Sequence, residues 1–308
     1  MPEQEQSRIV GTTETGEPMS EADKPVVVGV DGSLHNASAV EWAAEEADRA
    51  HRTLCLVTGT AEFSQPRVGV GTEYVVAYDT DLHFNRMMID LARRIRTEHP
   101  SVLVSPGVRR GEASACLAEL SRTASVVVVG KRGLGAVRRA MLGSTSIATV
   151  GRTRCPTVVV PDDWRPRAHA GEPLLVGIDL QHDSDPVLDF AFARAQRMGV
   201  PLIAMHVWEV HPFAVPPAEE LAHLAVDAKH AVEGVLRYWR EKYPDVEAIA
   251  SQAHDHPARG LLDASEHTQL LILGRTSSSA RLTGLPFGSV TRAVLHYSDR
   301  PVAIVPTF

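Results

Sequence analysis

The feature that most constrains the fold is that the chain repeats itself at about half its length. The segment PVVVGVDGS at 25–33 is matched by PLLVGIDLQ at 173–181, which starts 148 residues later. Near the end of each copy, VVVVGKR at 126–132 is matched by LLILGRT at 270–276, 144 residues later. A repeat of this length predicts two copies of one domain, since domains commonly contain roughly 100–200 residues.

The ends of these matches predict the domain boundaries. We expect a disordered tail at 1–24, a first domain at 25–161, a linker at 162–172 and a second domain at 173–308. The tail contains six acidic and two basic residues and little apolar surface that could be buried. The linker contains proline and glycine and shows no hydrophobic periodicity.

Composition excludes several classes of protein. The net charge of −7 argues against a nucleic-acid partner. No apolar run approaches the ~20 residues of a membrane span, and the N-terminus lacks the pattern of a signal peptide. Three widely spaced cysteines predict buried free thiols and a cytoplasmic location rather than a disulfide framework. Met1 and Met19 are alternative translation starts.

Each copy alternates short apolar strands with amphipathic helices. Strands are predicted near 26–30, 53–58, 102–108, 126–130 and 156–160, and again near 174–178, 201–207, 246–252, 269–273 and 301–305. Helices are predicted near 34–51, 80–98, 112–123 and 144–152 in the first copy. This alternation predicts the α/β class, with two tandem doubly wound domains whose parallel sheets carry helices on both faces.

Two features of the first copy follow strands directly. Asp31 ends the first strand, and Gly130 ends the fourth and opens a loop with Gly133, Gly143 and Ser144. In a doubly wound sheet, ligands bind at such carboxyl ends where the strand order reverses. Glycines permit close backbone approach and positive φ, and a helix that begins at Ser144 offers unpaired N–H groups to an anion. We therefore expect a phosphate site, with Asp31 at the other end of a nucleotide.

Each of these residues also has a purely structural interpretation. The sequence Asp31-Gly32-Ser33 is typical of a turn and N-cap, and Gly143-Ser144-Thr145 is typical of a helix start. Lys131 and Arg132 add positive charge next to the loop, as phosphate ligands or as solvated loop charges.

The loop differs from the standard phosphate motifs, since neither G-x-x-x-x-G-K-[ST] nor a helix-opening G-x-G-x-x-G occurs. From Gly130 to Ser144 the loop has the spacing G-2x-G-9x-G-[S/T]. This spacing, together with Asp31, resembles the motif of the ATP-binding subgroup of the universal stress protein family. The resemblance extends over 25–161 and 173–306 and is to the tandem-domain, actinobacterial-type members of that family.

The resemblance implies a five-stranded parallel sheet in each domain, with strand order 3-2-1-4-5 and ATP, alone or with Mg²⁺, at its carboxyl edge. The loop glycines, Ser144 and Thr145 would hold the phosphates, Asp31 would contact ribose or adenine, and Val57 would lie near adenine. It also implies a regulator or sensor in the stress or dormancy response. Members of the family commonly dimerise by pairing their fifth strands. In a tandem chain, the fifth strands of the two domains can form this pairing within one chain. A homodimer of whole chains is expected as well.

The second copy keeps part of this pattern. Its matching positions are Asp179, Gly274, Gly288, Ser289 and Val290. The inner glycine is replaced by Ser277, the loop is one residue longer, and Asp255 stands where the first copy has Gly111. A side chain at 277 hinders positive φ and an acid at 255 would oppose phosphate, so we expect weaker ATP binding in this domain.

Alternatives remain open at this stage. The same site could serve a slow ATPase or phosphotransferase, or the loops could be helix caps in a nucleotide-independent scaffold. The segment HDHP at 254–257 offers imidazoles and a carboxylate, but a cap or rim role is expected and no metal site is predicted. His206 lies near the end of a predicted strand. It could be a polar residue with its hydrogen bonds satisfied, or it could line the ligand site of the second copy.

Overall fold

The computed structural model describes residues 20, 23–33, 36–60, 80–133, 142–210, 216–275 and 287–307. Within these residues, ten strands form one sheet in the order β3-β2-β1-β4-β5-β10-β9-β6-β7-β8. The strands of the first half are β1 (Val26–Gly29), β2 (Leu54–Thr60), β3 (Val104–Arg110), β4 (Val126–Gly130) and β5 (Thr157–Val160). Those of the second half are β6 (Leu174–Gly177), β7 (Leu202–Trp208), β8 (Ala248–His254), β9 (Leu270–Arg275) and β10 (Val302–Pro306).

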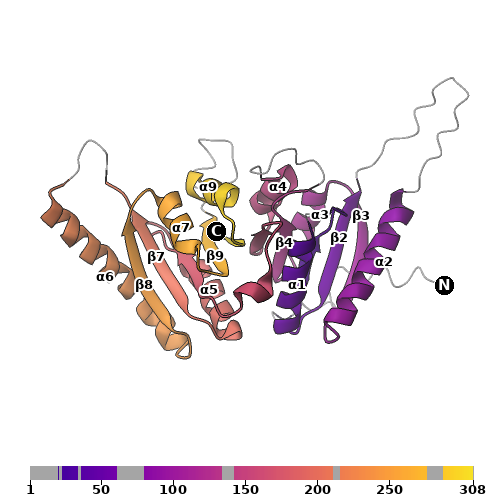
Figure 1. Cartoon of the computed structure of the whole chain (residues 1–308), viewed down its shortest axis with the longest axis horizontal. Coiled ribbons are helices and arrows are strands. Elements are labelled where there is room, and N and C mark those ends of the chain that lie inside the picture. The colour runs from indigo at the N-terminus through magenta and orange to yellow at the C-terminus, as the bar shows by residue number, and fades with distance from the viewer. Residues whose placement is uncertain are drawn as a thin grey trace, which may run out of the picture.

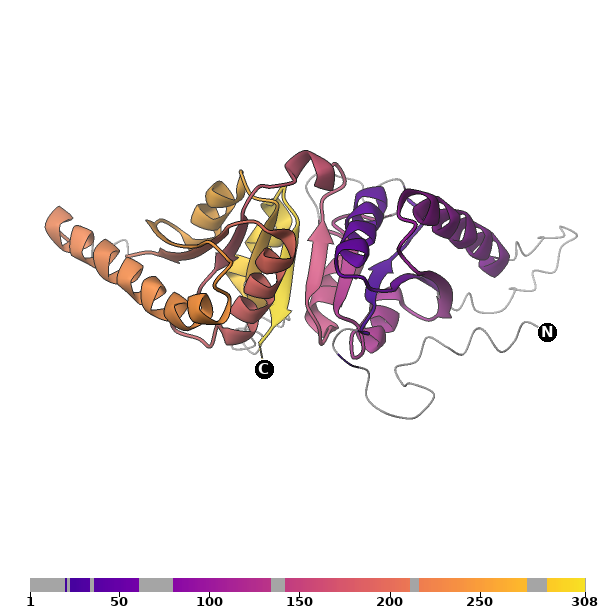
Figure 2. The same ribbon diagram turned by 90° about the horizontal axis from the view of Figure 1, so that it is seen from below.

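Helices cover both faces of this sheet (Figures 1 and 2). One face carries α1 (Ala37–Arg49), α2 (Thr80–Glu98), α5 (Asp185–Met198) and α6 (Ala218–Lys242). The other carries α3 (Ala113–Leu120), α4 (Ser144–Arg152), α7 (Pro257–Ser265) and α9 (Ser289–Tyr297). A short 3₁₀ helix, η2 (Pro166–His169), lies between the halves. The predicted α/β class, the order 3-2-1-4-5 and its repetition are confirmed.

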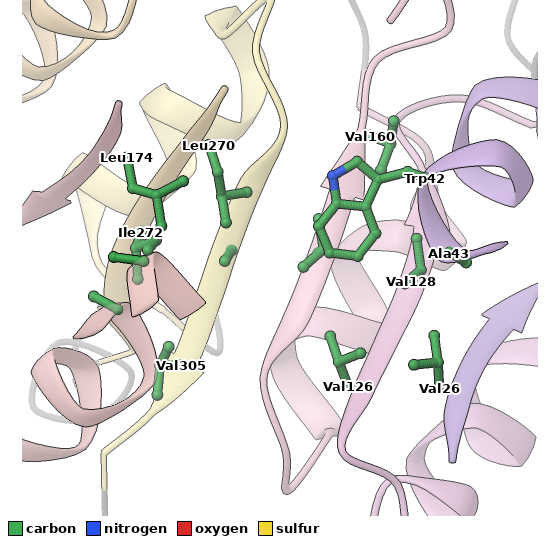
Figure 3. Packing of buried hydrophobic residues seen from close by; sticks show 14 of the residues in the cluster. Val26, Trp42, Ala43, Val126, Val128, Val160, Leu174, Leu270, Ile272 and Val305 are labelled. Atoms are coloured by element: carbon green, nitrogen blue, oxygen red, sulfur yellow. The ribbon is translucent and has the colours of Figure 1, made fainter. Parts of the chain in front are cut away.

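The sequence accounts for the two buried faces. The central strands are continuous runs of valine and leucine, as expected where helices cover both sides of a parallel sheet. In β1, Val26 and Val28 point into the α1 face, whereas Val27 points into the α4 face. Figure 3 shows the first of these cores, in which Trp42 of α1 lies near Val128 and Val160. The three cysteines are buried free thiols, as predicted.

The two halves join through their fifth strands. β5 and β10 pair antiparallel, with Val158 opposite Ala303, Thr157 opposite Ile304 and Val159 opposite Val302. Val158 and Ala303 occupy the same position in the repeat, so a local twofold axis passes between them. The tandem chain thus forms internally the fifth-strand pairing that the family resemblance implies. Because these strands are antiparallel, the carboxyl ends of the two halves point in opposite directions at the junction.

Helices α1 and α5 also meet across this axis. Glu46 of α1 and Arg194 of α5 form a buried ion pair, with Nη1 of Arg194 2.6 Å from Oε2 of Glu46. The guanidinium carbon of Arg194 lies 4.6 Å from the ring centroid of Trp42. Burial in this contact lowers the pKa of Arg194, and the neighbouring Glu46 carboxylate opposes that shift. Glu46 and Arg194 are equivalent positions of the repeat, so the axis brings unlike charges together.

Candidate functional site

The predicted site of the first domain, called the first crevice below, lies at the carboxyl ends of β1 and β4, which are neighbours in the sheet. Asp31 follows β1 in a tight turn, in which its Oδ1 accepts a hydrogen bond from the Ser33 N–H at 2.9 Å. Gly32 has a φ of +79°, which a side chain would disfavour. The expected N-cap role of this segment is wrong, because α1 begins only after Asn36, whose side chain donates instead to the Gly29 carbonyl.

The carboxylate and the glycine loop converge at Gly133. A Cβ atom at this position would lie 2.7 Å from Oδ2 of Asp31, which is closer than real contacts of this kind. The expectation that the loop glycines supply positive φ is wrong within the described part of the loop. Positive φ occurs in neither Gly130, Gly133 nor Gly143, so Gly133 is required by the close approach to Asp31.

The start of α4 forms the other side of this crevice. Gly143 is its N-cap residue, with a φ of −66° and no side-chain cap, and its N–H donates to the Lys131 carbonyl at 2.9 Å. Ser144 and Thr145 are exposed. The hydroxyl of Ser146 is buried instead; it donates to the Gly130 carbonyl at 2.7 Å and ties the helix start to the strand end. Residues 134–141 of the loop, including Arg138 and Arg139, lie outside the described residues.

The two basic residues of the loop face the domain junction. Nη2 of Arg132 lies 2.6 Å from Oδ2 of Asp162 in the linker. Nζ of Lys131 donates to the Ser298 carbonyl of the second domain at 2.7 Å. Burial lowers the pKa of Lys131, and the nearby Asp299 opposes that shift. Their charges therefore bind protein groups in this structure and are not directed into the crevice as free phosphate ligands.

Val57, expected near adenine, lies in β2 opposite Gly29. Its side chain packs in the core on the α4 face, and its carbonyl accepts a hydrogen bond from the Val30 N–H at 2.7 Å. Gly59, two residues further along, approaches α3 so closely that a Cβ atom would lie 2.6 Å from the Ala113 Cα. The end of β2 thus presents backbone rather than bulky side chains beside the crevice.

The second crevice contains a cavity of about 490 Å³ at the carboxyl ends of β6, β7 and β9. All five residues predicted for this domain, Asp179, Gly274, Gly288, Ser289 and Val290, line it. As in the first copy, the strand-end carboxylate forms a turn, with Oδ1 of Asp179 accepting from the Gln181 N–H at 3.0 Å. Helix α9 begins at Ser289, after the N-cap residue Gly288, and has no side-chain cap. Ser277 and Pro286 lie outside the described residues.

The charge of this second cavity is dominated by acids. Its described lining contains three carboxylates, from Asp179, Asp183 and Glu209, and neither lysine nor arginine. Nδ1 of His182 lies 2.8 Å from Oδ2 of Asp179. His206 combines both of its expected roles, because it lines the cavity and its Nδ1 lies 2.9 Å from the Ile178 carbonyl.

Asp255 does not oppose an anion in the way that the sequence suggested. It is not part of the cavity lining, and its Oδ2 lies 3.7 Å from Nε of Arg259 in α7. His254 stacks on Trp208, with ring centroids 4.5 Å apart. In the part of the chain that the structure describes, no group of three histidine, cysteine or acidic residues is arranged to hold a metal ion.

Sequence reasoning missed two further residues that line the second cavity. Trp208 ends β7 two residues beyond His206, and Thr307 directly follows β10. The hydroxyl of Thr307 donates to the Arg275 carbonyl at 2.9 Å. Both could have been found by following each neighbouring strand to its carboxyl end, since those ends meet at one edge of a parallel sheet.

Two parallel half-sheets, joined through their fifth strands, define a tandem α/β protein. The chain belongs to the universal stress protein family, whose sequence profile matches residues 24–161 and 172–306. Both copies of the repeat are therefore domains of this family. None of the described helices is both long and apolar enough to cross a membrane.

Known proteins resemble the chain over almost its whole length. A universal stress protein of Mycobacterium tuberculosis is 32% identical over 285 residues, covering 91% of this chain and 96% of that protein. Another, of Mycolicibacterium smegmatis, is 31% identical over 287 residues, with coverage of 91% and 96%. A solved universal stress protein from Archaeoglobus fulgidus matches with a TM-score of 0.67 at 14% identity, covering 92% and 97%, and so shares the fold.

Proposed function

We propose that the chain is an ATP-binding regulator or sensor of the cytoplasm, and that ATP, with or without Mg²⁺, binds the first crevice. The observation that carries this proposal is the contact between Asp31 and Gly133 beside the uncapped start of α4. It supports the proposal because a carboxylate, which can accept from ribose or adenine, and N–H groups, which can donate to phosphate, lie close together. The family and the loop spacing support the same ligand class.

Different parts of the crevice suit different parts of the nucleotide. The first N–H groups of α4 have no intrahelical partners and lie at the positive end of the helix dipole, so they favour phosphate oxygens. The exposed hydroxyls of Ser144 and Thr145 add donors there. The Asp31 carboxylate would repel phosphate and suits the hydroxyl or N–H groups of the nucleoside.

We propose weaker ATP binding in the second domain, for a reason different from the one that the sequence suggested. Three carboxylates line that cavity, and their negative charges would repel a triphosphate. The Asp179 carboxylate is also engaged by His182, a bond that a ribose would have to replace. A homodimer of chains belongs to the same proposal.

The test is a Gly133→Ala substitution. Its methyl group would displace the carboxyl end of the Asp31 side chain rather than any backbone atom, so the fold should persist. We expect ATP affinity, measured by calorimetry, to fall by about tenfold, the equivalent of one lost hydrogen bond to a charged group. Nucleotide recovered from the purified parent protein would identify the ligand directly.

Gly234→Ala is the matched control. Gly234 lies in α6, and an added Cβ atom there meets nothing within 4 Å. This variant should bind ATP like the parent. Absence of ATP binding stronger than millimolar in the parent, or equal affinity of Gly133→Ala and the parent, would contradict the proposal. Sustained turnover that Asp31→Asn abolishes would instead show an ATPase or phosphotransferase at the same site.

A further inference from the structure

Two basic residues cross the domain junction in the same way. Lys131 directly follows Gly130, the last residue of β4, and Arg275, at the equivalent position of the repeat, is itself the last residue of β9. Lys131 Nζ donates to the Ser298 carbonyl at 2.7 Å. Arg275 donates through Nη1 to the Val150 carbonyl at 2.5 Å and through Nη2 to the Thr153 carbonyl at 2.9 Å.

These contacts are equivalent halves of one arrangement. Thr153 is the C-cap residue of α4, and Ser298 is the C-cap residue of α9, at the same position in the repeat. The last carbonyls of a helix lack intrahelical partners and lie at the negative end of its dipole, so a cation there is stabilising. The antiparallel junction makes this reach possible, because the carboxyl edge of one half adjoins the C-terminal helix end of the other.

The helices that are held in this way are those that open the crevices. α4 starts at the first crevice and α9 lines the second, and each is nine residues long, or about 13 Å. A short helix behaves as a rigid unit, so fixing its last turn also fixes the position of its first turn.

We propose that Lys131 and Arg275 are cross-domain positioning residues, each of which holds the helix whose start forms part of the other domain's crevice. This inference rests on the proposed function for its binding readout. The same two residues also contact their own crevices through their backbones. The Lys131 carbonyl accepts from Gly143 at the start of α4, and the Arg275 carbonyl accepts from Thr307, which lines the second cavity.

The consequence is that the two crevices are coupled. A ligand bound in one crevice restrains the backbone of the cation beside it, and the side chain of that cation holds the helix of the other domain, so the second helix has less freedom to lose on binding. Removing one cation should therefore weaken binding in the crevice that it does not line. We expect a change of about three- to tenfold, within the usual range of coupling between sites.

The decisive variant is Arg275→Met, which removes the hydrogen bonds to α4 from a residue outside the first crevice. The affinity of the first crevice for ATP should fall about three- to tenfold, which is the size expected for coupling between the two sites. Arg275→Lys, which keeps a cation, should recover part of the affinity. The control is Arg152→Met at the end of the same helix, since Arg152 bonds only Glu112 and Ser114 of its own domain in the described structure. This control should bind ATP like the parent.

Hydrogen exchange separates this inference from the proposed function. Without nucleotide, the first amide that is hydrogen-bonded within each helix should exchange faster: that of Ile147 in α4 in Arg275→Met, and that of Arg292 in α9 in Lys131→Met. If the parent binds no ATP, the proposed function fails and this exchange pattern alone decides the positioning role. A lower melting temperature with unchanged ATP affinity and unchanged exchange at these two amides would show that the cations only stabilise the junction, and would overturn the inference.

Discussion

Asp48 shows how one carboxylate ties α1 to the segment before β3. Its Oδ1 accepts from the Ser101 hydroxyl, and its Oδ2 lies 3.1 Å from Nδ1 of the buried His99. The Ser101 hydrogen bond, followed by the contact with His99, lowers the pKa of Asp48 below its usual value of 3.8. The contribution of Asp48 to stability is therefore present above that value and is lost as the pH falls through the lower pKa of the folded state.

We expect Asp48→Asn to lower the free energy of unfolding at pH 7, and to have a smaller effect below about pH 4. The loss should stay under about 1 kcal/mol, because the side chain is 37% exposed and water screens its charge. Urea unfolding of the parent and variant at both pH values measures the difference. Asp90→Asn, at an exposed surface pair with Arg93, should change neither value. An equal loss at both pH values would show that the Asp48 carboxylate is not the titrating group.

At single positions, the sequence predicted where functional groups stand but not where they point. Asp31 and Gly133 were expected to meet because strand ends converge, and they do. Lys131 and Arg132 were expected either at phosphate or as solvated loop charges. Their long side chains instead bond groups 167 and 30 residues away in the chain, at the C-cap of α9 and in the linker. Local sequence carries no information about which distant carbonyl or carboxylate a flexible cation will meet.

At the level of elements, α1 and α5 are held together by ion pairs of Glu46 with the buried Arg194 and, at 3.4 Å, with the more exposed Arg197. Taking Glu46 away leaves the buried Arg194 charge uncompensated, which typically costs about 3–5 kcal/mol. We expect Glu46→Arg and Arg194→Glu each to lower the melting temperature, Glu46→Arg more strongly. The double swap should recover part of the loss, because it restores unlike charges at equivalent positions but places a cation at position 46 beside Arg197. Thermal unfolding of the three variants tests this.

Arg167→Gln is the surface control for this swap. Nε of Arg167 lies 3.2 Å from Oε1 of the neighbouring Glu45, but its side chain is 74% exposed, so its loss should cost less than about 1 kcal/mol. If the double swap is no more stable than the single variants, the charge pair does not determine how α1 and α5 pack.

The elements themselves were largely predictable, and the reason is physical. Strands such as VVVVG at β4 are buried on both faces, so their apolar runs are continuous and their ends are sharp. The start of α1 was predicted three residues too early, because Asp31 and Ser33 form a turn of their own and leave Asn36 as the N-cap residue. Side chains that suit a cap suit a turn equally, and only the path of the chain decides between them.

At the level of the whole molecule, the two crevices should differ in occupancy. We expect one ATP per chain when the first site is saturated, because the acidic lining of the second cavity opposes a triphosphate. Asp31→Asn should weaken that binding, whereas Asp179→Asn should leave it unchanged. Equilibrium dialysis measures the stoichiometry in each variant. Two sites of equal affinity in the parent would contradict the asymmetry.

The contact between positions 46 and 194 has a consequence for the history of the chain. In a dimer of identical subunits, a residue on the twofold axis meets its own copy, so a glutamate there always faces a glutamate. Two copies joined in one reading frame escape this restriction, because one copy can mutate while the other is retained. Glu46 against Arg194 is such a difference. The two unlike halves attract each other at this contact, whereas two copies of the same half would bring like charges together. The fused pair therefore cannot readily revert to two exchangeable subunits.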